Sequence, residues 1–434
     1  MPKVTLIYPQ WENRGLNSIP FLQLTPQGPN QIAALTPLNW EVEIIDESKQ
    51  SINFDAPTDL VGISAMSAQA PRAYEIAWEY RRRGVTTILG GVHGSVLTEE
   101  ATSHFDSVVV GEADEIWPKV LDDFSKGCLE PIYRPELPKT LNFSYCRNIS
   151  RINRCHSVKH PTLGVNLALL QAQRGCPRGC DYCSVTSFSG NIVRTRDIDS
   201  VLEDVEREKA NGADYFFFID DNIIGNKHYA KVLFRELISQ RIKWIAQSVV
   251  NIADEEDDIL DLALESGFCG VYLGLESIKS ETLSQISSAK TKWRQSYEKY
   301  LSRLRKNGVL TMAGFIFGHD TDDRQIVQRT VNWTIDNHID LIQLFVLTPL
   351  PGTKLYYKMV ADNRLISYDW TKYCGMDLVY KSPVWTDEEL KEEIRQGYQK
   401  FYSSLSIFKR MIGLKPDKIP YFLAMNHESR RGVI

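Results

Sequence analysis

Three cysteines lie close together in the string QRGCPRGCDYCS: Cys176, Cys180 and Cys183. Their spacing of three residues and then two, inside a short glycine-rich loop, suits three thiolates that bind one iron–sulfur cluster. A tetrahedral zinc site normally needs a second Cys or His pair nearby, and none follows. A [4Fe–4S] cluster usually takes four thiolates, so three local ligands would leave one iron open to a substrate or cofactor.

This string resembles the signature of the radical S-adenosylmethionine (SAM) superfamily. The signature is Cys-x3-Cys-x2-Cys with an aromatic residue before the last cysteine, here Tyr182. The resemblance implies that the open iron chelates the amino and carboxylate groups of SAM. The alternatives are three incidental or buried cysteines, a zinc protein, and a non-catalytic iron–sulfur scaffold. A cluster that only carries electrons needs four thiolates, so three favour chemistry.

The composition is that of an ordinary globular protein. Its 434 residues, 43% of them hydrophobic, predict two or three domains. The net charge of −5 and pI near 6.0 give no electrostatic footprint for nucleic acid. The N-terminus MPKVTLIYP is typical of a strand rather than a signal peptide, and no apolar run reaches 18 residues. We therefore expect a cytoplasmic protein with no nucleic-acid partner and no transmembrane segment.

The other cysteines are scattered. They form no C-x2-C pair, which argues against a disulfide framework and against a second cluster held by a local motif. A reducing, oxygen-poor setting fits best, and the cluster would then be oxygen-sensitive.

The first 133 residues alternate between short apolar runs and helical stretches, which predicts a doubly wound parallel sheet. The helical stretch Ala70–Arg83 has apolar residues at three-and-four spacing. The predicted strands are Val4–Tyr8, Trp40–Asp46, Leu60–Ser64, Thr86–Gly90 and Ser107–Val110. Small residues gather at several strand ends, where such sheets bind ligands. These ends form either a nucleotide-sized pocket or simply tight turns.

The run from Trp40 to about Tyr133 resembles the cobalamin-binding domain that precedes the radical SAM core in one large subfamily. It lacks the Asp-x-His-x-x-Gly motif that supplies a histidine to cobalt, as many radical SAM relatives do. We interpret His93 as a loop residue beside the pocket, not as a cobalt ligand. The resemblance implies a Rossmann-like domain whose corrinoid contacts are Ser64, Ala65, Met66, Ser67, Gly90, Gly91, Val92, His93, Gly111 and Glu112.

Residues 134–163 are punctuated by prolines and predict a linker, although they could also line a substrate channel. Residues 164–357 then repeat a strand and a helix, which predicts a partial (β/α)6 barrel with its reacting groups at the carboxyl ends of the strands. The predicted barrel strands are Leu167–Ala172, Tyr215–Ile219, Lys243–Ser248, Gly270–Leu275, Leu310–Phe317 and Leu341–Leu347. Residues 358–434 predict a mostly helical cap with one long helix, Asp387–Met411.

Polar residues and glycines follow several barrel strands. The resemblance implies that they contact SAM, each with a structural alternative such as a helix cap or a tight bend. These predicted SAM contacts are Tyr182, Asp220, Asp221, Asn222, Glu276, Ser277, Gly314 and Gly318. Arg174 could neutralise cluster charge or cover the loop, and we expect Arg194 and Arg196 to pair with helix carboxylates.

The family resemblance implies a mechanism. A reduced cluster cleaves SAM to a 5′-deoxyadenosyl radical, which takes hydrogen from an unactivated carbon, and methylcobalamin then supplies the methyl group. The predicted activity is therefore C-methylation of a small or lipid-like molecule. The alternative is a non-methylating radical reaction, such as cyclisation, ring contraction, hydroxylation or carbon–carbon coupling. Flavodoxin or ferredoxin is the expected electron donor.

Overall fold

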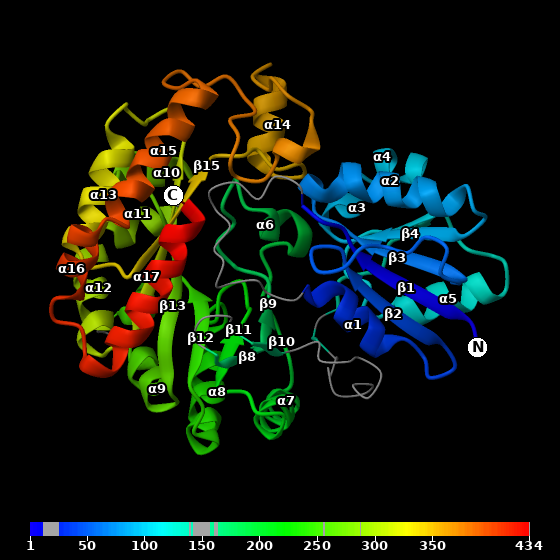
Figure 1. The fold of residues 1–434 in the computed structure, drawn as a ribbon, viewed down its shortest axis with the longest axis horizontal. Coiled ribbons are helices and arrows are strands. Elements are labelled where there is room, and N and C mark those ends of the chain that lie inside the picture. Colours follow the sequence, from blue (N-terminus) through cyan, green and yellow to red (C-terminus); the bar gives the residue numbers. More distant parts are fainter. Residues whose placement is uncertain are drawn as a thin grey trace.

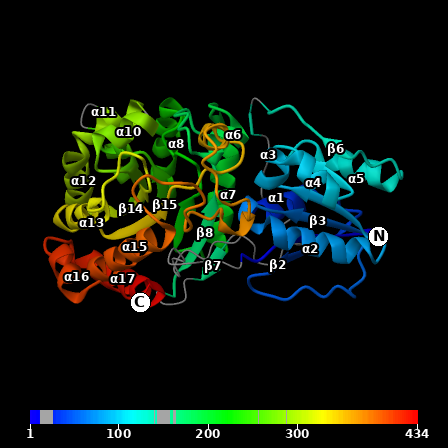
Figure 2. The ribbon, with the colours of Figure 1, turned by 90° about the horizontal axis from the view of Figure 1, so that it is seen from above.

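The structure, a computed structural model, describes residues 1–11, 26–138, 140–141, 157–159, 164–254, 257–286 and 288–433. Two α/β bodies lie side by side (Figures 1 and 2). The N-terminal body is blue to cyan, and the larger second body runs from green through yellow to the red C-terminal helices. The short helix α6 (Ser184–Ser189) lies on the side of the second body that faces the first.

The N-terminal body is built on a parallel sheet of six strands in the order β2-β1-β3-β4-β5-β6. Its strands are β1 (Lys3–Tyr8), β2 (Glu41–Asp46), β3 (Leu60–Ser64), β4 (Thr86–Gly90), β5 (Ser107–Val109) and β6 (Ile132–Tyr133). The chain reverses its direction of winding between β1 and β3, and ligands bind beyond the carboxyl strand ends at such a switch point.

Helices cover both faces of this sheet. Helices α1 (Gln27–Leu35) and α5 (Trp117–Ser125) pack on one face, while α2 (Ala70–Arg81) and α4 (Thr98–His104) pack on the other. The apolar positions of α2 at three-and-four spacing are all buried, as their periodicity predicts. The predicted doubly wound sheet is therefore confirmed. Two short elements follow strand ends: η3 (Ser67–Gln69) and α3 (Val92–Val96).

The second body is built on a seven-stranded sheet in the order β15-β14-β13-β12-β11-β8-β7. The strands that pair in parallel are β8 (Asn166–Leu170), β11 (Tyr215–Phe218), β12 (Trp244–Ser248), β13 (Phe268–Glu276), β14 (Leu310–Phe317) and β15 (Leu341–Val346). They form the predicted partial (β/α)6 barrel. The antiparallel edge strand β7 (Ser157–Lys159) lies in the stretch predicted as a linker.

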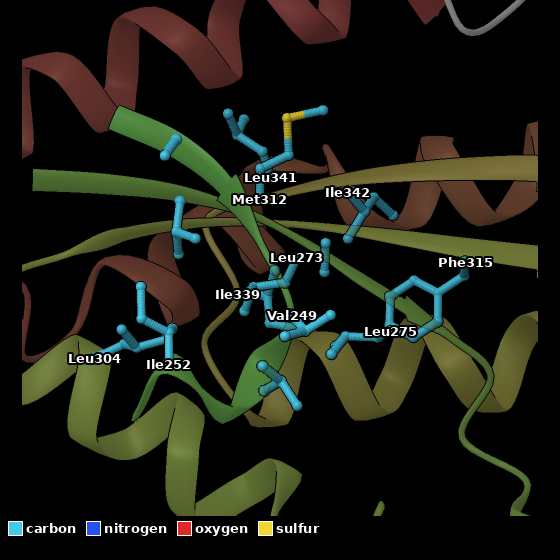
Figure 3. Packing of buried hydrophobic residues seen from close by; sticks show 14 of the residues in the cluster. Val249, Ile252, Leu273, Leu275, Leu304, Met312, Phe315, Ile339, Leu341 and Ile342 are labelled. Carbon is cyan, nitrogen blue, oxygen red and sulfur yellow. The ribbon is translucent and has the colours of Figure 1, made fainter. Parts of the chain in front are cut away.

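Helices wrap the outer face of the barrel. They are α7 (Ile198–Ala210), α8 (Lys227–Gln240), η5 (Val250–Ala253), α9 (Ile259–Glu265), α10 (Ser280–Ile286), α11 (Ser288–Arg294), α12 (Tyr297–Lys306) and α13 (Ile326–Asp336). Figure 3 shows part of this core, in which Ile252 and Leu304 lie beside each other and Leu273 lies near Val249 and Ile339. Burying this apolar face is the main stabilisation of the barrel, at roughly 25 cal/mol per Å².

The sequence after the cysteine loop predicts a helix over Arg194–Ala210, but the helix begins only at Ile198. The carboxylate of Asp197 accepts a hydrogen bond from the Ser200 amide at 3.1 Å and caps the helix there. Residues Arg194–Thr195 instead form β10, which pairs with β9 (Gln173–Arg174) across the base of the cysteine loop.

The predicted long helix Asp387–Met411 is two helices, α15 (Asp387–Phe401) and α16 (Ser404–Met411). The Ser403 hydroxyl accepts a hydrogen bond from the Ser406 amide and starts the second helix. The break turns Leu405 and Phe408 to solvent, although the periodicity places them on the buried face. The remaining elements of this region are α14 (Lys354–Ala361), η6 (Trp370–Lys372), η7 (Pro416–Lys418) and α17 (Ile419–Val433). Among the described residues, none of the helices is both long and apolar enough to cross a bilayer.

A buried arginine on α16 anchors this C-terminal region to the barrel. Arg410 has no exposed surface and donates to the carbonyls of Ile339, Asp340 and Phe401. We predict that Arg410→Ala lowers the free energy of unfolding by about 3 kcal/mol, because several buried carbonyls lose their donor. Urea unfolding would measure the change. Arg395→Ala removes a half-exposed arginine of α15 that pairs with the neighbouring Glu392, and it should cost less than about 0.5 kcal/mol. Equal losses would contradict the prediction.

Candidate functional site

The three cysteines lie on one loop between β9 and α6, and the backbone of that loop is tightly constrained. Gly175 has φ +92°, and a Cβ there would lie 2.1 Å from the Ile192 carbonyl oxygen. Gly179 is also left-handed, at φ +64°. The Cys183 amide donates to the Cys180 carbonyl at 3.1 Å. The glycines therefore let the backbone turn twice within the short stretch that carries the cysteines.

The environment of the thiols fits metal ligation. Cys180 is buried, and Cys176 and Cys183 are partly exposed. Burial raises the pKa of Cys176, and it raises the pKa of Cys183 to about 11. Such thiols stay protonated at neutral pH until a metal takes the place of the proton. Within the described part of the chain, no three His, Cys, Asp or Glu side chains converge on a single ion. In a [4Fe–4S] cluster each thiolate binds a different iron.

Two carboxylates after β11 hold the segment that leads into the cysteine loop. The Ala172 and Gln173 amides each donate to Asp220 at 2.8 Å, and the Gly175 amide donates to Asp221 at 2.7 Å. Asp220 is fully buried, and burial raises its pKa to about 8. The structure thus gives both residues a positioning role, while their predicted contact with SAM stays a prediction.

The third residue of this group, Asn222, is also buried. Its side-chain oxygen accepts a hydrogen bond of 3.4 Å from the Val249 amide. Its side-chain amide nitrogen is buried without a hydrogen-bond partner. A buried donor of this kind costs free energy unless a ligand accepts from it. Asn222 therefore remains a good candidate for a ligand contact at the mouth of the barrel.

The fourth barrel strand meets the cysteine loop through a carboxylate. Glu276 ends β13 in the left-handed region, at φ +64°, and forms an ion pair with Lys290 of α11. Tyr182 of the cysteine loop is hydrogen-bonded to Glu276, and burial followed by the charge of this carboxylate raises the Tyr182 pKa well above its usual value. The hydroxyl of Ser277 accepts from the Lys279 amide at 3.1 Å. Three predicted SAM contacts, Tyr182, Glu276 and Ser277, thus lie in one neighbourhood.

The two predicted adenine glycines have demanding surroundings. A Cβ on Gly314 would lie 2.3 Å from the Tyr272 hydroxyl oxygen. Gly318 has φ +106°, and its carbonyl accepts a hydrogen bond from Tyr380. Packing against Tyr272 therefore favours glycine at position 314, and the backbone conformation favours it at position 318. The next residue, His319, is 4% exposed, and its Nε2 has no hydrogen-bond partner.

A cavity of about 290 Å³ opens at this mouth. It joins the cysteine loop to the ends of the last barrel strands and to α14. Its lining residues are Asp181, Tyr182, Gln285, Ile286, His319, Asp320, Leu347, Lys354, Leu355, Lys358 and Met359. This mixed lining of charged, aromatic and apolar groups suits a charged cofactor such as SAM.

A second cavity, of about 260 Å³, lies between the two bodies. It is walled by the carboxyl ends of β3, β4 and β5 on one side and by Gln171, Arg174, Phe188 and Ile219 on the other. Five predicted corrinoid contacts line it: Ser64, Gly90, Gly91, Gly111 and Glu112. A Cβ on Gly91 would lie 2.8 Å from the Ala65 carbonyl, so only glycine leaves this wall open.

The other five predicted corrinoid contacts do not line this cavity. Met66, Ser67 and Val92 border a smaller cavity beside Leu350, and Ala65 is buried. His93 points away from the strand ends because its Nε2 lies 2.6 Å from the Tyr74 hydroxyl. The loop after β3 turns into η3, which places Met66 and Ser67 beside Leu350.

His93 belongs to a buried network between the two bodies. The Tyr74 hydroxyl and the Trp370 indole N–H each donate to Glu100 at 2.8 Å. His93 itself has no exposed surface, and burial lowers its pKa to about 4. The network fixes the N-terminal body against the segment after the barrel, which is a structural role.

Charged residues also join the bodies beside the larger cavity. Glu112 of the N-terminal body forms a bidentate ion pair with Arg194 and pairs with Arg174 at 2.8 Å. Burial by itself would raise the pKa of Glu112, but the two guanidinium groups lower it. The prediction that Arg194 pairs with a helix carboxylate is therefore wrong, whereas Arg196 does pair with Asp204 of α7 at 2.7 Å.

Sequence reasoning missed one wall of the cavity. Helix α1 contributes Gln27, Gly28, Pro29, Gln31 and Ile32, and the other missed residues include Asp114, Trp117, Gln171, Phe188 and Ile219. The string TPQGPNQ could have served as a signal, since a glycine at a helix start lets a ligand approach the backbone closely. Nothing in the local sequence could have shown that Ile219 and Phe188 face the other body.

Comparison with known proteins defines the class. A family model described as the radical SAM superfamily matches residues 170–334. Bacteriochlorophyllide d C-8(2)-methyltransferase of Chlorobaculum tepidum is 30% identical over 397 residues, 88% of this chain and 86% of that protein. The C-12(1)-methyltransferase of the same organism is 28% identical over 408 residues, 92% of this chain and 88% of that protein. The chain therefore belongs to the radical SAM superfamily, and it is similar over most of its length to these two methyltransferases.

A solved structure extends the comparison to both bodies. The radical SAM methyltransferase TsrM from Kitasatospora setae, determined with cobalamin and a [4Fe–4S] cluster bound, has a TM-score of 0.66 and 16% identity to this chain. The match covers 96% of this chain and 90% of that protein. The two proteins therefore share a fold from the N-terminal sheet to the C-terminal helices.

The buried histidine network predicts a dependence of stability on pH. An unfolded histidine takes up a proton near pH 6.5, whereas folded His93 does so only near pH 4. The free energy of unfolding should therefore fall as the pH falls from about 6.5 to 4, by up to ~3 kcal/mol from this residue. His93→Gln should reduce that loss in urea unfolding at pH 7 and pH 4.5. Exposed His228→Gln should leave it unchanged, and no difference between the two variants would refute the prediction.

The carboxylate beneath the cysteine loop predicts an effect on metal loading. Asp220→Ala leaves two buried backbone amides without an acceptor. The segment that leads into the cysteine loop should therefore lose its fixed position, and the free energy of unfolding should fall by about 2–4 kcal/mol. Iron bound per chain after anaerobic reconstitution should fall together with thermal stability. Asp122→Ala, at an exposed position on α5, is the control and should keep full iron content. Normal iron content in the Asp220 variant would count against the role.

Proposed function

We propose that this chain is a cobalamin-dependent radical SAM C-methyltransferase. The observation that carries the proposal is the place of the interdomain cavity. One of its walls is Arg174, two residues before Cys176, and the opposite wall is the glycine-rich strand ends of the N-terminal sheet. A corrinoid between these walls would lie next to the cysteine loop, where a methyl donor and a radical source are needed together.

The cysteine loop would hold a [4Fe–4S] cluster through Cys176, Cys180 and Cys183. SAM would bind the remaining iron and extend into the cavity at the barrel mouth. We assign Tyr182, Glu276 and Ser277 to its polar groups on the strength of their shared neighbourhood, and Gly314 and Gly318 to its adenine. Asn222 offers a buried donor to its methionyl part, while Asp220 and Asp221 act through the loop that they hold.

The chain's own residues would do the positioning. Gly90, Gly91 and Gly111 keep the wall of the corrinoid site flat, and the pair of Glu112 with Arg194 holds the two bodies at a fixed separation. When bound, the cluster and SAM would supply a hydrogen-abstracting radical and cobalamin would supply the methyl group. The protein orients these groups and excludes water.

The domains would divide this work. Residues 1–133 would hold the corrinoid, and residues 134–163 would connect this domain to the barrel. Residues 164–357 would hold the cluster and SAM, and residues 358–434 would cap the substrate site. Free cysteines in the described chain support a reducing cytoplasm, with a flavodoxin or ferredoxin as the electron donor. We propose a small or lipid-like substrate, as in the similar methyltransferases whose names specify a bacteriochlorophyllide.

Anaerobic reconstitution with iron, sulfide and hydroxocobalamin tests the cofactors. We predict a cluster and about one corrinoid per chain in the natural protein. Cys180→Ala should lose both cluster absorbance and SAM cleavage, because one of three thiolate ligands is missing. Cys128→Ala removes an exposed cysteine and should keep both. Retained SAM cleavage in the Cys180→Ala variant would contradict the assignment of enzyme activity to this site.

The same preparation separates methylation from its alternative. With SAM labelled by a deuterated methyl group, a C-methyltransferase gives a labelled product once the substrate is supplied. A cluster without corrinoid, or SAM cleavage that never labels a product, would instead favour a non-methylating radical reaction.

A further inference from the structure

The inner face of the barrel is hollow and mostly apolar. Side chains alternate along a strand, and residues paired across neighbouring strands share a face. By the strand register, Ile245, Gly270, Leu310 and Leu341 share the inner face. Along β12 and β15 the outer-face residues are buried. On the inner face Ile245, Gln247, Gln343 and Phe345 are half-exposed, whereas Leu341 is buried. A complete barrel fills its interior with side chains, and this one leaves room.

A cavity of about 160 Å³ occupies the base of this space. The first halves of the barrel strands line it, including Ile245, Cys269, Leu310 and Leu341, and α17 borders it with Tyr421 and Met425. Figure 3 shows Leu341 next to Met312, on the face of the strands opposite to Leu304 and Ile252. Most of the lining is apolar, and Asp340 and Lys418 are its charged members.

Glycine keeps the space open. Gly270 faces the cavity from β13, and a Cβ there would lie 2.8 Å from the Ile245 side chain. Protein interiors are close-packed, and an apolar void costs stability unless something fills it. Apolar cavities of this size stay dry and bind apolar molecules.

An apolar strip, itself mostly buried, runs from this basal cavity toward the interdomain cavity. Leu167, Leu169 and Phe217 pack as one cluster with Tyr215, Ile219 and Ile245. Tyr215 and Phe217 line the basal cavity, while Ile219 lines the interdomain cavity beside the cysteine loop. The cluster therefore runs along the inside of β8 and β11 from one cavity to the other.

We propose that the barrel interior binds a long apolar tail of the substrate, whose end lies in the basal cavity under α17. This inference rests on the proposed function, because it places the reacting carbon at the mouth between the cysteine loop and the interdomain cavity. The tail lies along the strip on β8 and β11. At about 160 Å³ the basal cavity takes the end of a tail rather than a whole ligand.

The length of the barrel sets the length of the substrate. Glu276 marks the mouth and Gly270 the basal cavity on the same strand, and at about 3.3 Å per residue they lie ~20 Å apart. A substrate that reacts at the mouth and fills the base is therefore an acyl, isoprenoid or similarly extended apolar molecule. Compact polar metabolites would leave the base empty.

Binding of a fluorescent long-chain fatty acid, cis-parinaric acid, to the natural full-length protein tests the site. Leu310→Trp fills the basal cavity, and we expect it to weaken binding roughly tenfold or more. Leu405→Trp makes the same change at an exposed position on α16 and should leave binding unchanged. Hexadecanoate should displace the probe and hexanoate should not, because only the longer chain reaches the base.

Each outcome decides the proposal. It is overturned if the natural protein does not bind the probe, if Leu310→Trp binds it equally well, or if Leu405→Trp releases it and Leu310→Trp does not. If Leu310→Trp unfolds, Cys269→Leu fills the same cavity with a smaller change and must also weaken binding. SAM cleavage and corrinoid content should be unchanged in the Leu405→Trp control. Their absence in the natural protein would remove the proposed function and leave the apolar site standing.

Discussion

The structure depends on one buried ion-pair cluster between its two bodies. Glu112 follows strand β5 of the N-terminal sheet and forms ion pairs with Arg194 and Arg174. These arginines lie on the paired strands β10 and β9, on either side of the cysteine loop. Burying these charges is costly unless each finds its partner with good geometry. Any shift of one body against the other would leave a buried carboxylate or guanidinium without its ion-pair partner. The cluster therefore fixes the cavity and the cysteine loop in one arrangement.

Around that constraint, ordinary groups take on positioning roles. Asp220 and Asp221 accept backbone amides from the segment that enters the cysteine loop, so the second barrel strand holds what the first strand presents. Tyr182 and Glu276 join the same loop to the fourth strand. With the Glu112 ion pairs, these contacts hold the loop from three directions before any cofactor binds, which lowers the ordering cost of assembling a cluster site.

The inside and the outside of the barrel are built by different rules. Outer-face residues such as Leu273 and Trp244 are packed under helices and stabilise the fold. Inner-face residues such as Ile245 and Tyr272 remain partly exposed around a hollow. The same alternation along a strand therefore supplies stability on one face and a binding surface on the other.

The sequence by itself determined the class of protein and the succession of strands and helices along the chain. These features are local patterns: the Cys-x3-Cys-x2-Cys loop, the repeated strands and the glycine-rich strand ends. Local patterns can be recognised in a sequence without knowledge of its tertiary contacts. Tertiary structure alone decided which strand-end residues face a cavity: Gly91 lines it, while neighbouring His93 turns to Tyr74. It also gave Arg194 a partner 82 residues away in sequence and split the helix at Ser403. Such pairings depend on how two bodies pack, and no local spacing encodes that geometry.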